Sequence, residues 1–478
     1  MKNSISKNYI YSLINQIINI LVPLITIPYV SRIILPENIG IYSYTSSITT
    51  YFILFGSLGI NLYAQREISY SQDDIKIRSK KFWEIFILKS ITLIISIICY
   101  YLLLCRNNEN SLYYRLLLIE IVSNIFDISW LYQGIEEFKY IIVKNIIIKV
   151  ISTILIFLFI NNNKDLNIYI LIIVLSNLFG NLSLWFNAFK YIKIYNLKKL
   201  EILKNLKIII IFFIPQIACY VYNILDKIML GYIINDKSEV GFYEYADNII
   251  KMCITITATL TLVIMPRIAY YYSKHDNNKI NNYLIKSLKY VMFISIPMMF
   301  GIISISNRLI PIFLGNGYDK VVILLNILSI VVVFASISRI IGSGYLVPTN
   351  KMKEYNMSVI IGAIVNFILN ILLIRYYSSI GACIGTVIAE FVVTIIQLIS
   401  IKNIIKFKDI ISISYKCLIS SIIMYIINLI LGYFIKYNLV SIIIEIVLSI
   451  IVYFILLIIL KDNLIKEIIN KIKKIITP

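Results

Sequence analysis

Charged side chains are scarce in this sequence, and their scarcity decides which solvent the chain can face. Of its 478 residues, 15% are charged and 59% are hydrophobic. A soluble chain of this length would need a far more polar surface to cover its domains. We therefore expect most of the chain to lie in a lipid bilayer.

Histidine and cysteine, which supply many metal ligands and catalytic bases, offer little here. His275 is the only histidine and falls in an expected loop, which excludes a histidine-based metal site or general base inside the membrane. The six cysteines show no C-x-x-C or other metal spacing, and we interpret them as small buried apolar residues. The sequence therefore predicts no metal, no cofactor and no catalytic residue, and it leaves any coupling ion open.

Long apolar runs recur from one end of the chain to the other. Each has about the 20 residues that a helix needs to cross a hydrocarbon layer of about 30 Å. They are continuous, whereas membrane barrel strands alternate lipid-facing and lumen-facing residues. The predicted fold class is an all-α integral membrane protein with about fourteen transmembrane helices. The expected spans are 9–34, 40–64, 83–104, 112–131, 141–160, 168–189, 208–233, 245–268, 290–313, 321–346, 357–374, 380–399, 413–435 and 440–460.

The net charge of +20 is distributed unevenly among the loops between these spans. Most lysines and arginines fall in the termini and in the loops that lie on the same side as the N-terminus. Because positively charged loops are retained in the cytoplasm, we expect both termini to be cytoplasmic. Topology retention explains these clusters better than nucleic-acid binding does.

One residue pattern occurs twice: a glycine, tyrosines two and four positions later, and an arginine 26 positions later. The copies are Gly40, Tyr42, Tyr44 and Arg66, and Gly241, Tyr243, Tyr245 and Arg267. Chance in a tyrosine-rich chain is the alternative to a true repeat. If the repeat is real, two six-helix lobes run in parallel around a central cavity. The predicted parts are an N-terminal lobe at 1–206, a second lobe at 207–408, and two extra helices with a basic cytoplasmic tail at 409–478.

Polar side chains form stripes along several expected spans, with the 4, 3, 4 spacing of one helix face. Such groups are costly in hydrocarbon and should face protein or water. Interhelical hydrogen bonds are the simpler interpretation for any single residue, but stripes on several spans together favour a water-filled cavity. The stripe residues include Asn15, Asn19, Asp127, Tyr220, Asn223, Asp226, Lys227, Arg339 and Glu390.

Three stretches of the chain resemble bacterial polysaccharide exporters of the O-antigen flippase type, within the multidrug and oligosaccharidyl-lipid exporter superfamily. The stretches are IPYVSR at 27–32 followed by PENIG at 36–40, DISWLYQGIE at 127–136, and LDKIMLG at 225–231 followed by VGFYE at 240–244. The resemblance covers roughly the first 400 residues.

This resemblance implies a multi-pass protein of the cytoplasmic membrane that moves an undecaprenyl-diphosphate-linked oligosaccharide to the outer leaflet by alternating access. Membrane lipids would surround it, and a polysaccharide polymerase and glycosyltransferases are candidate partners. The diphosphate calls for fixed cations and the sugar for amides, hydroxyls and aromatic rings. The cationic candidates are Arg32, Arg66, Lys227, Arg267 and Arg339. The sugar-binding candidates are Asn15, Asn19, Tyr220 and Asn223.

Asp127, Asp226 and Glu390 are expected to pair with these cations or to respond to protons. For Arg66 and Arg267, anchoring at the cytoplasmic membrane edge is an equal alternative. The first span lacks the carboxylate through which drug-extruding relatives couple to ions. A multidrug cation antiporter of the same fold is the second hypothesis and a membrane-bound polysaccharide polymerase is the third, although no outer loop is long enough for a polymerase site.

Overall fold

The computed structural model of the chain describes residues 2–106, 108–195, 200–202, 206–405, 407–434, 438–462 and 464–466. Every regular element in these residues is a helix, because a bilayer offers no water to satisfy exposed backbone groups. Two compact units divide the chain, and we refer to Met1–Gly241 as unit 1 and to Phe242–Pro478 as unit 2. The three-part division expected from the sequence stays a prediction.

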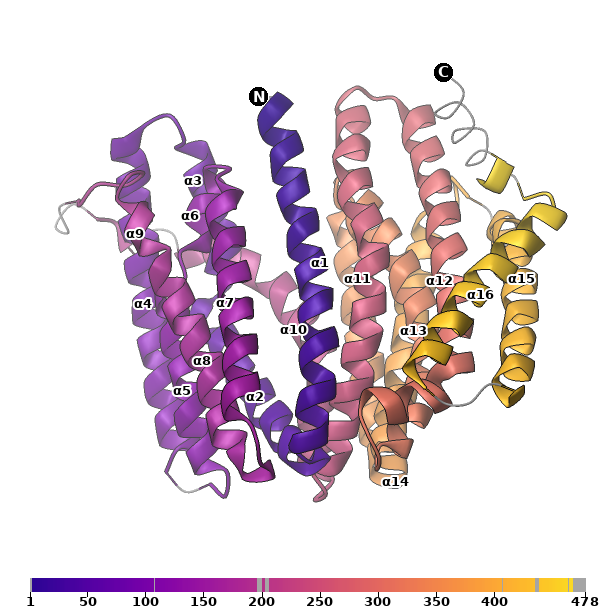
Figure 1. Cartoon of the computed structure of the whole chain (residues 1–478). Helices are drawn as coiled ribbons and strands as arrows, with labels where there is room; N and C mark the ends of the chain where they lie inside the picture. Colours follow the sequence, from indigo (N-terminus) through magenta and orange to yellow (C-terminus); the bar gives the residue numbers. More distant parts are fainter. Residues whose placement is uncertain are drawn as a thin grey trace. The chain divides into compact units, whose positions relative to one another are not determined.

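Unit 1 is built from ten α-helices and a short 3-10 helix, and in Figure 1 its helices α4, α5, α7 and α8 run side by side. The elements are α1 (Lys2–Ile33), α2 (Pro36–Ser57), α3 (Ile60–Tyr70), α4 (Ile75–Leu104), α5 (Ser111–Phe126), α6 (Ser129–Gly134), α7 (Phe138–Phe159), η1 (Asn163–Asp165), α8 (Leu166–Ser183), α9 (Trp185–Ala188) and α10 (Leu206–Ile233).

Unit 2 is also a helical bundle, with α12 packed against both α13 and α15. Helix α11 begins in the last residues of unit 1. The elements are α11 (Ser238–Ser273), α12 (Asn277–Phe313), α13 (Asp319–Ile341), the π-helical turn η4 (Gly342–Leu346), α14 (Met352–Ser400), α15 (Phe407–Phe434) and α16 (Leu439–Ile459).

The helices confirm the predicted fold class, and each of the fourteen expected spans overlaps one of them. Among the described residues, 11 helical segments are long and apolar enough to cross a membrane by themselves. The pair α2 and α3 makes a twelfth, bent by 41° where Leu58 and Gly59 adopt left-handed backbone angles. A glycine tolerates such angles without steric cost, which accounts for Gly59 at this break.

The 49-residue helix α14 is a hairpin of two antiparallel segments, and it accounts for two expected spans. Ser378 leaves the helical region, with φ of 51° and ψ of −130°. On either side of this break, Gly381 packs against the backbone of Leu373, and Gln397 donates a hydrogen bond to Ser358 Oγ over 3.1 Å. Both pairs are centred close to Ser378 in the sequence, so the chain turns back on itself there.

The stretch at 127–136 forms part of the core of unit 1. The short helix α6 buries Trp130, Leu131 and Tyr132, all at most 1% exposed. Trp130 packs on Phe82 of α4, with their ring centroids 5.1 Å apart. A side chain at Gly134 would overlap Ile68 of α3, so this glycine permits close packing. The residues that carry the family resemblance here are therefore packing residues.

Gly40 and Gly241, the repeated glycines, lie where two backbone segments of unit 1 approach each other closely. A Cβ atom on Gly40 of α2 would overlap the carbonyl oxygen of Lys237, and a Cβ atom on Gly241 would overlap the carbonyl oxygen of Pro36. Lys237 and Pro36 each stand four positions before the other glycine, so the contact is reciprocal. Burial lowers the pKa of the Lys237 ammonium, which lies 4.7 Å from the ring centre of Tyr44, and the charge of Glu109 opposes that shift.

This reciprocal contact predicts that alanine at either glycine destabilises the protein. We expect Gly40→Ala to lower the free energy of unfolding by about 1–3 kcal/mol or more, because a backbone carbonyl cannot rotate away as a side chain can. The matched control is Gly301→Ala in α12, where an added Cβ meets nothing within 4 Å. Removing a helical glycine there should leave stability unchanged or raise it by up to about 1 kcal/mol. Thermal unfolding in detergent measures both, and equal melting temperatures for the two variants would contradict the interpretation.

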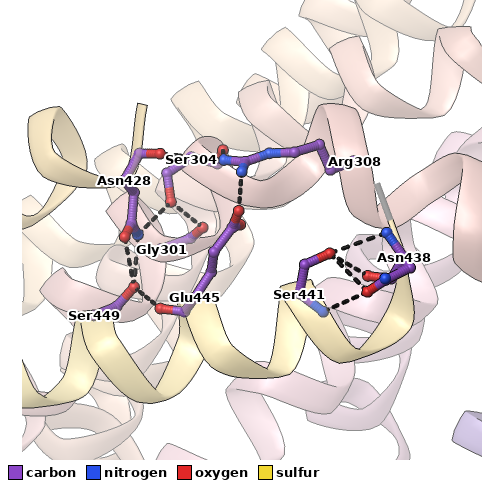
Figure 2. Close-up of polar contacts among 8 residues, drawn as sticks. All are labelled: Gly301, Ser304, Arg308, Asn428, Asn438, Ser441, Glu445 and Ser449. Carbon is purple, nitrogen blue, oxygen red and sulfur yellow. Dashed lines mark hydrogen bonds and ion pairs between the residues drawn. The ribbon is translucent and has the colours of Figure 1, made fainter. Parts of the chain in front are cut away.

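In unit 2, a buried ion pair fixes the last two helices to α12 (Figure 2). The guanidinium of Arg308 on α12 contacts the carboxylate of Glu445 on α16, and the two side chains are 8% and 1% exposed. Asn428 of α15 donates hydrogen bonds to Ser304 Oγ over 3.1 Å and to Ser449 Oγ over 2.6 Å. The network ties three helices together across 137 residues of chain.

The guanidinium also explains a glycine on α15. An added Cβ on Gly432 would overlap the guanidinium of Arg308, so only glycine leaves the space that this cation occupies. Arg308 Nη2 donates to the carbonyl oxygens of Ser304 over 3.2 Å and Asn428 over 3.3 Å. Its charge is therefore shared between one carboxylate and two helix carbonyls.

This network predicts that removing one partner of the ion pair destabilises the protein more than replacing both partners by apolar residues. Glu445→Ala leaves a buried guanidinium without its carboxylate, and we expect a loss of about 3–5 kcal/mol in the free energy of unfolding. The double variant Arg308→Met with Glu445→Leu replaces both charges by apolar groups, and should be markedly more stable than Glu445→Ala. Denaturant titration in mixed micelles measures both. A double variant as unstable as the single one would contradict this account.

Candidate functional site

Helices α1 and α7 run parallel along unit 1, and three contacts set their register. Asn145 Nδ2 donates a hydrogen bond to Asn15 Oδ1 over 3.3 Å, and the ammonium of Lys149 donates to Asn19 Oδ1. Near the other end, the hydroxyl of Tyr29 donates to the carbonyl oxygen of Ile160 over 2.8 Å. The sequence separation is 130 or 131 in all three pairs, as parallel helices require. The two asparagines that the sequence singled out thus face α7.

A polar pocket of about 250 Å³ lies beside this contact, between α5, α7 and α8. Ten of its twelve lining residues carry a charge, an amide or a hydroxyl, although all three helices are apolar enough to cross a membrane as segments of the bundle. We call it the polar pocket. Its lining residues are Glu120, Ser123, Asn124, Lys144, Asn145, Ile148, Lys149, Ser152, Ile173, Ser176, Asn177 and Asn181.

Hydrogen bonds between the helices hold the pocket's side chains in place. The ammonium of Lys144 donates to Asn181 Oδ1 over 2.9 Å, and Asn181 Nδ2 donates to Ser123 Oγ over 2.9 Å. This chain of bonds joins α7 to α8 and α8 to α5. The indole nitrogen of Trp185, at the start of α9, donates to the carbonyl oxygen of Phe126 over 2.9 Å and ties the C-terminal end of α5 to the chain that follows α8.

A third lysine, Lys89 on α4, is buried against α3 and the turn that follows α5. Lys89 is 1% exposed, and its ammonium donates to the carbonyl oxygen of Asp127 over 2.9 Å and to Asn61 Oδ1 over 3.3 Å. The carboxylate of Asp127 interacts electrostatically with both Lys89 and Lys144. It also accepts a hydrogen bond from the backbone amide of Ser129 over 3.0 Å, which starts α6. Asp127 therefore both balances two lysines and shapes the turn between α5 and α6.

The polar pocket places ammonium groups beside amides and hydroxyls in a bundle surrounded by hydrocarbon. Each such lysine costs about 2.5–3.5 kcal/mol at the centre of a bilayer even on lenient insertion scales. Ammonium groups bind phosphate oxygens as point charges, whereas amides and hydroxyls hydrogen-bond to sugars. The arrangement suits a ligand that joins a phosphate to a carbohydrate.

The structure brings together three residues predicted from the sequence, Asn15, Asn19 and Asp127, with lysines that the prediction missed. Lys89, Lys144 and Lys149 stand in runs of isoleucine that hide single charges in a hydropathy profile. A signal was present nevertheless, since Asn145, Lys149 and Ser152 repeat the spacing of 4 and 3 that marks one helix face.

The candidates on α10 lie in unit 1 as well. Asp226 and Lys227 are adjacent and buried, at 3% and 9% exposure. Asp226 interacts electrostatically with Tyr51 of α2, which agrees with the packing of α10 on α2. The side chains of Tyr220 and Asn223 lie outside the described residues, so their assignment stays a prediction.

Two of the predicted arginines, Arg32 and Arg66, lie in unit 1. Arg32 is exposed at the end of α1. Arg66 on α3 contacts Glu67 over 3.0 Å, and Lys81 contacts Glu67 over 3.8 Å and Glu84 over 3.6 Å. These four residues form an ion-pair network between α3 and α4, in agreement with the anchoring alternative for Arg66.

In unit 2, the three predicted residues stand on different helices. Arg267 on α11 and Arg339 on α13 are exposed, and Glu390 on α14 is half-buried. The carbonyl oxygen of Glu390 accepts a hydrogen bond from Thr394 Oγ1 over 2.8 Å. Their roles in binding or coupling, and the central cavity, stay predictions.

The sequence matches the family described as polysaccharide biosynthesis protein over residues 5–272, more than half of the chain. The chain belongs to this family. A second match, to the family described as MatE, covers residues 212–372. Curated relatives are named as a transporter and a flippase, and the chain belongs to a family of membrane transporters and not of enzymes.

Two curated relatives match this chain over nearly the whole of their own lengths. The chain is 27% identical over 409 residues to a protein of Escherichia coli (strain K12) that is named as an O-antigen transporter, covering 84% of this chain and 98% of the relative. It is 25% identical over 399 residues to the capsular polysaccharide biosynthesis protein CapF of Staphylococcus aureus, covering 81% and 97%.

Solved structures with the same fold confirm the architecture. The chain is similar to the lipid II flippase MurJ in an inward closed conformation, with a TM-score of 0.76 at 19% identity, over 96% of this chain and 99% of that one. It is also similar to an outward-facing multidrug resistance transporter of the MATE family, with a TM-score of 0.58 at 13% identity, over 86% and 96%. At these identities the likeness shows the fold alone.

Proposed function

We propose that the protein flips an undecaprenyl-diphosphate-linked oligosaccharide repeat unit from the inner to the outer leaflet of the cytoplasmic membrane, for surface polysaccharide biosynthesis. The observation that carries this proposal is the polar pocket, in which Lys144 and Lys149 accompany five amide and hydroxyl side chains on α7 and α8. A diphosphate cannot cross hydrocarbon without compensating cations, and the sugar needs hydrogen-bond partners when it leaves water. The pocket supplies both.

The proposed cycle exposes the polar pocket to one side of the membrane and then to the other. Lys144 and Lys149 hold the cargo's diphosphate by charge, and the amides of Asn145 and Asn177 bind its sugar. Asn15 and Asn19 keep Asn145 and Lys149 oriented when the site is empty. Both termini lie in the cytoplasm in this proposal, because the positively charged loops share their side. Glycosyltransferases supply the cargo, and a polysaccharide polymerase consumes it.

A multidrug cation antiporter is the second candidate, and the match to the MatE family over residues 212–372 favours it. The charge of the polar pocket argues against it. Lys144 and Lys149 stand with one carboxylate, Glu120, among the lining residues, so a cationic drug meets excess positive charge. Like charges at close range disfavour binding in a low-dielectric bundle.

The proposal predicts that Lys149→Met abolishes glycan export. Expressed in bacteria that lack their own flippase, the unchanged protein should restore surface glycan, and the variant should restore less than about a tenth of it, because a buried charge pair with a phosphate is worth several kcal/mol. The matched control is Lys139→Met, an exposed lysine in the first turn of the same helix, which should restore glycan fully.

Membrane insertion of each variant is measured by immunoblotting of the membrane fraction. Drug tolerance of the same cells separates the two candidates. Restored drug tolerance without surface glycan would overturn the flippase proposal in favour of the antiporter. Full glycan export by Lys149→Met would show that the polar pocket is not the site.

A further inference from the structure

A long apolar groove runs between α7 and α8, next to the polar pocket. Its volume is about 520 Å³. Apolar side chains from both helices form its walls, chiefly Ile147, Ile151, Leu155, Leu171, Leu175 and Phe179. Ile147, Ile151 and Phe179 are 51%, 48% and 65% exposed, so the groove opens on the surface of unit 1. We call it the α7–α8 groove.

The groove is long enough to hold an extended hydrocarbon chain. Along α7 it reaches from Lys144 to Phe159, sixteen residues that span about 22 Å of helix axis. The hydrocarbon core of a bilayer is about 30 Å thick. The groove is therefore about three quarters as long as this core is thick.

Lys144 belongs to both sites. It lines the α7–α8 groove and the polar pocket, as do Ile148 and Ser176. Gly180 lets the side chain of Ile148 lie directly against α8, because an added Cβ there would overlap Ile148. This contact closes the seam between the two helices next to Lys144. The ammonium thus stands where an apolar surface ends and a hydrophilic one begins.

We propose that the α7–α8 groove holds the polyprenyl chain of the cargo while Lys144 binds the diphosphate to which that chain is attached. The inference rests on the proposed function and adds the place of the lipid. The order of surfaces, apolar groove, then a cation, then amides and hydroxyls, matches the order of a polyprenyl chain, a diphosphate and an oligosaccharide. A bulk phospholipid would use the groove and the cation but leave the sugar-binding amides of Asn145 and Asn177 unused.

In lipid the polyprenyl chain gains affinity through packing contacts, since the surrounding acyl chains are equally apolar. Filling the groove should therefore weaken binding of a long chain and spare a short one. The test uses the full-length protein in nanodiscs and measures the affinity of two probes, undecaprenyl diphosphate and farnesyl diphosphate. The unchanged protein should bind the longer probe roughly fivefold or more tightly.

Leu155→Trp fills the far part of the groove, about 16 Å of helix axis from Lys144, and Leu171→Trp fills it from the facing helix. Each should reduce the preference for undecaprenyl diphosphate to near unity while farnesyl diphosphate, whose chain is too short to reach these positions, binds as before, which also shows that the variant is folded. The matched control is Ile154→Trp, at a residue of α7 that is 51% exposed and lies outside the groove lining, and it should keep the full preference. Lys144→Met should weaken both probes together.

Three outcomes would overturn the inference. An unchanged chain-length preference in both tryptophan variants would show that the groove does not hold the chain, while the polar pocket and the flippase proposal would stand. An equal loss in Ile154→Trp would assign the effect to general perturbation of α7. If the unchanged protein bound neither diphosphate and also failed to restore surface glycan, the proposed function itself would fail together with the inference.

Discussion

Charged and amide side chains within hydrocarbon must be satisfied by one another or by water, and the architecture of unit 1 depends on this constraint. Lys89, Lys144 and Lys149 each donate to an amide or a carbonyl oxygen on another helix or in the turn after α5. These bonds determine which faces of α1, α4, α5, α7 and α8 can meet. Lys144 and Lys149 also line the polar pocket, so the same two side chains serve both packing and binding.

Unit 2 meets the constraint in a different way. Arg308 and Glu445 are buried together, and Asn428 joins them through Ser304 and Ser449. Here the charges neutralise each other in a packed interior, whereas Lys144 and Lys149 of unit 1 line the polar pocket. Buried pairs of this kind fix the arrangement of helices more than they add stability. The last two helices, which lie beyond the stretch that resembles known exporters, are held by this network.

Most of the fold could be predicted from the sequence because apolar length alone determines a membrane-spanning helix. The turn at Ser378 falls between the expected spans 357–374 and 380–399. The bend between α2 and α3 could not be predicted, since Leu58 adopts its unusual backbone angles under tertiary packing that no local pattern reveals. Polar spacing identified Asn15 and Asn19 correctly as residues that face another helix. It missed Lys144 and Lys149 because isolated charges within isoleucine runs barely alter mean hydropathy.

The roles expected of Arg32, Lys227, Arg267, Arg339 and Glu390 depend on a conformational cycle that a single structure does not display, and they stay predictions. For Arg66, residue type alone leaves two roles open, because a cation next to a membrane edge serves equally as a ligand or as an anchor. Its contacts with Glu67 and two tyrosine rings, at 5.4 and 5.7 Å, satisfy its charge locally. Contacts across the bundle, rather than charge itself, distinguish the lysines of the polar pocket.

The central claim is that the polar pocket of unit 1 contains water within the membrane. Its most direct test is the reactivity of single cysteines toward a sulfonated maleimide, in a cysteine-free variant of the protein in nanodiscs. Ser152→Cys, which lines the polar pocket, should react rapidly, and Ile154→Cys, on the apolar surface of the same helix, should react at least roughly tenfold more slowly, because thiolate forms only where water and charge stabilise it. Equal and slow reaction at both positions would contradict the account.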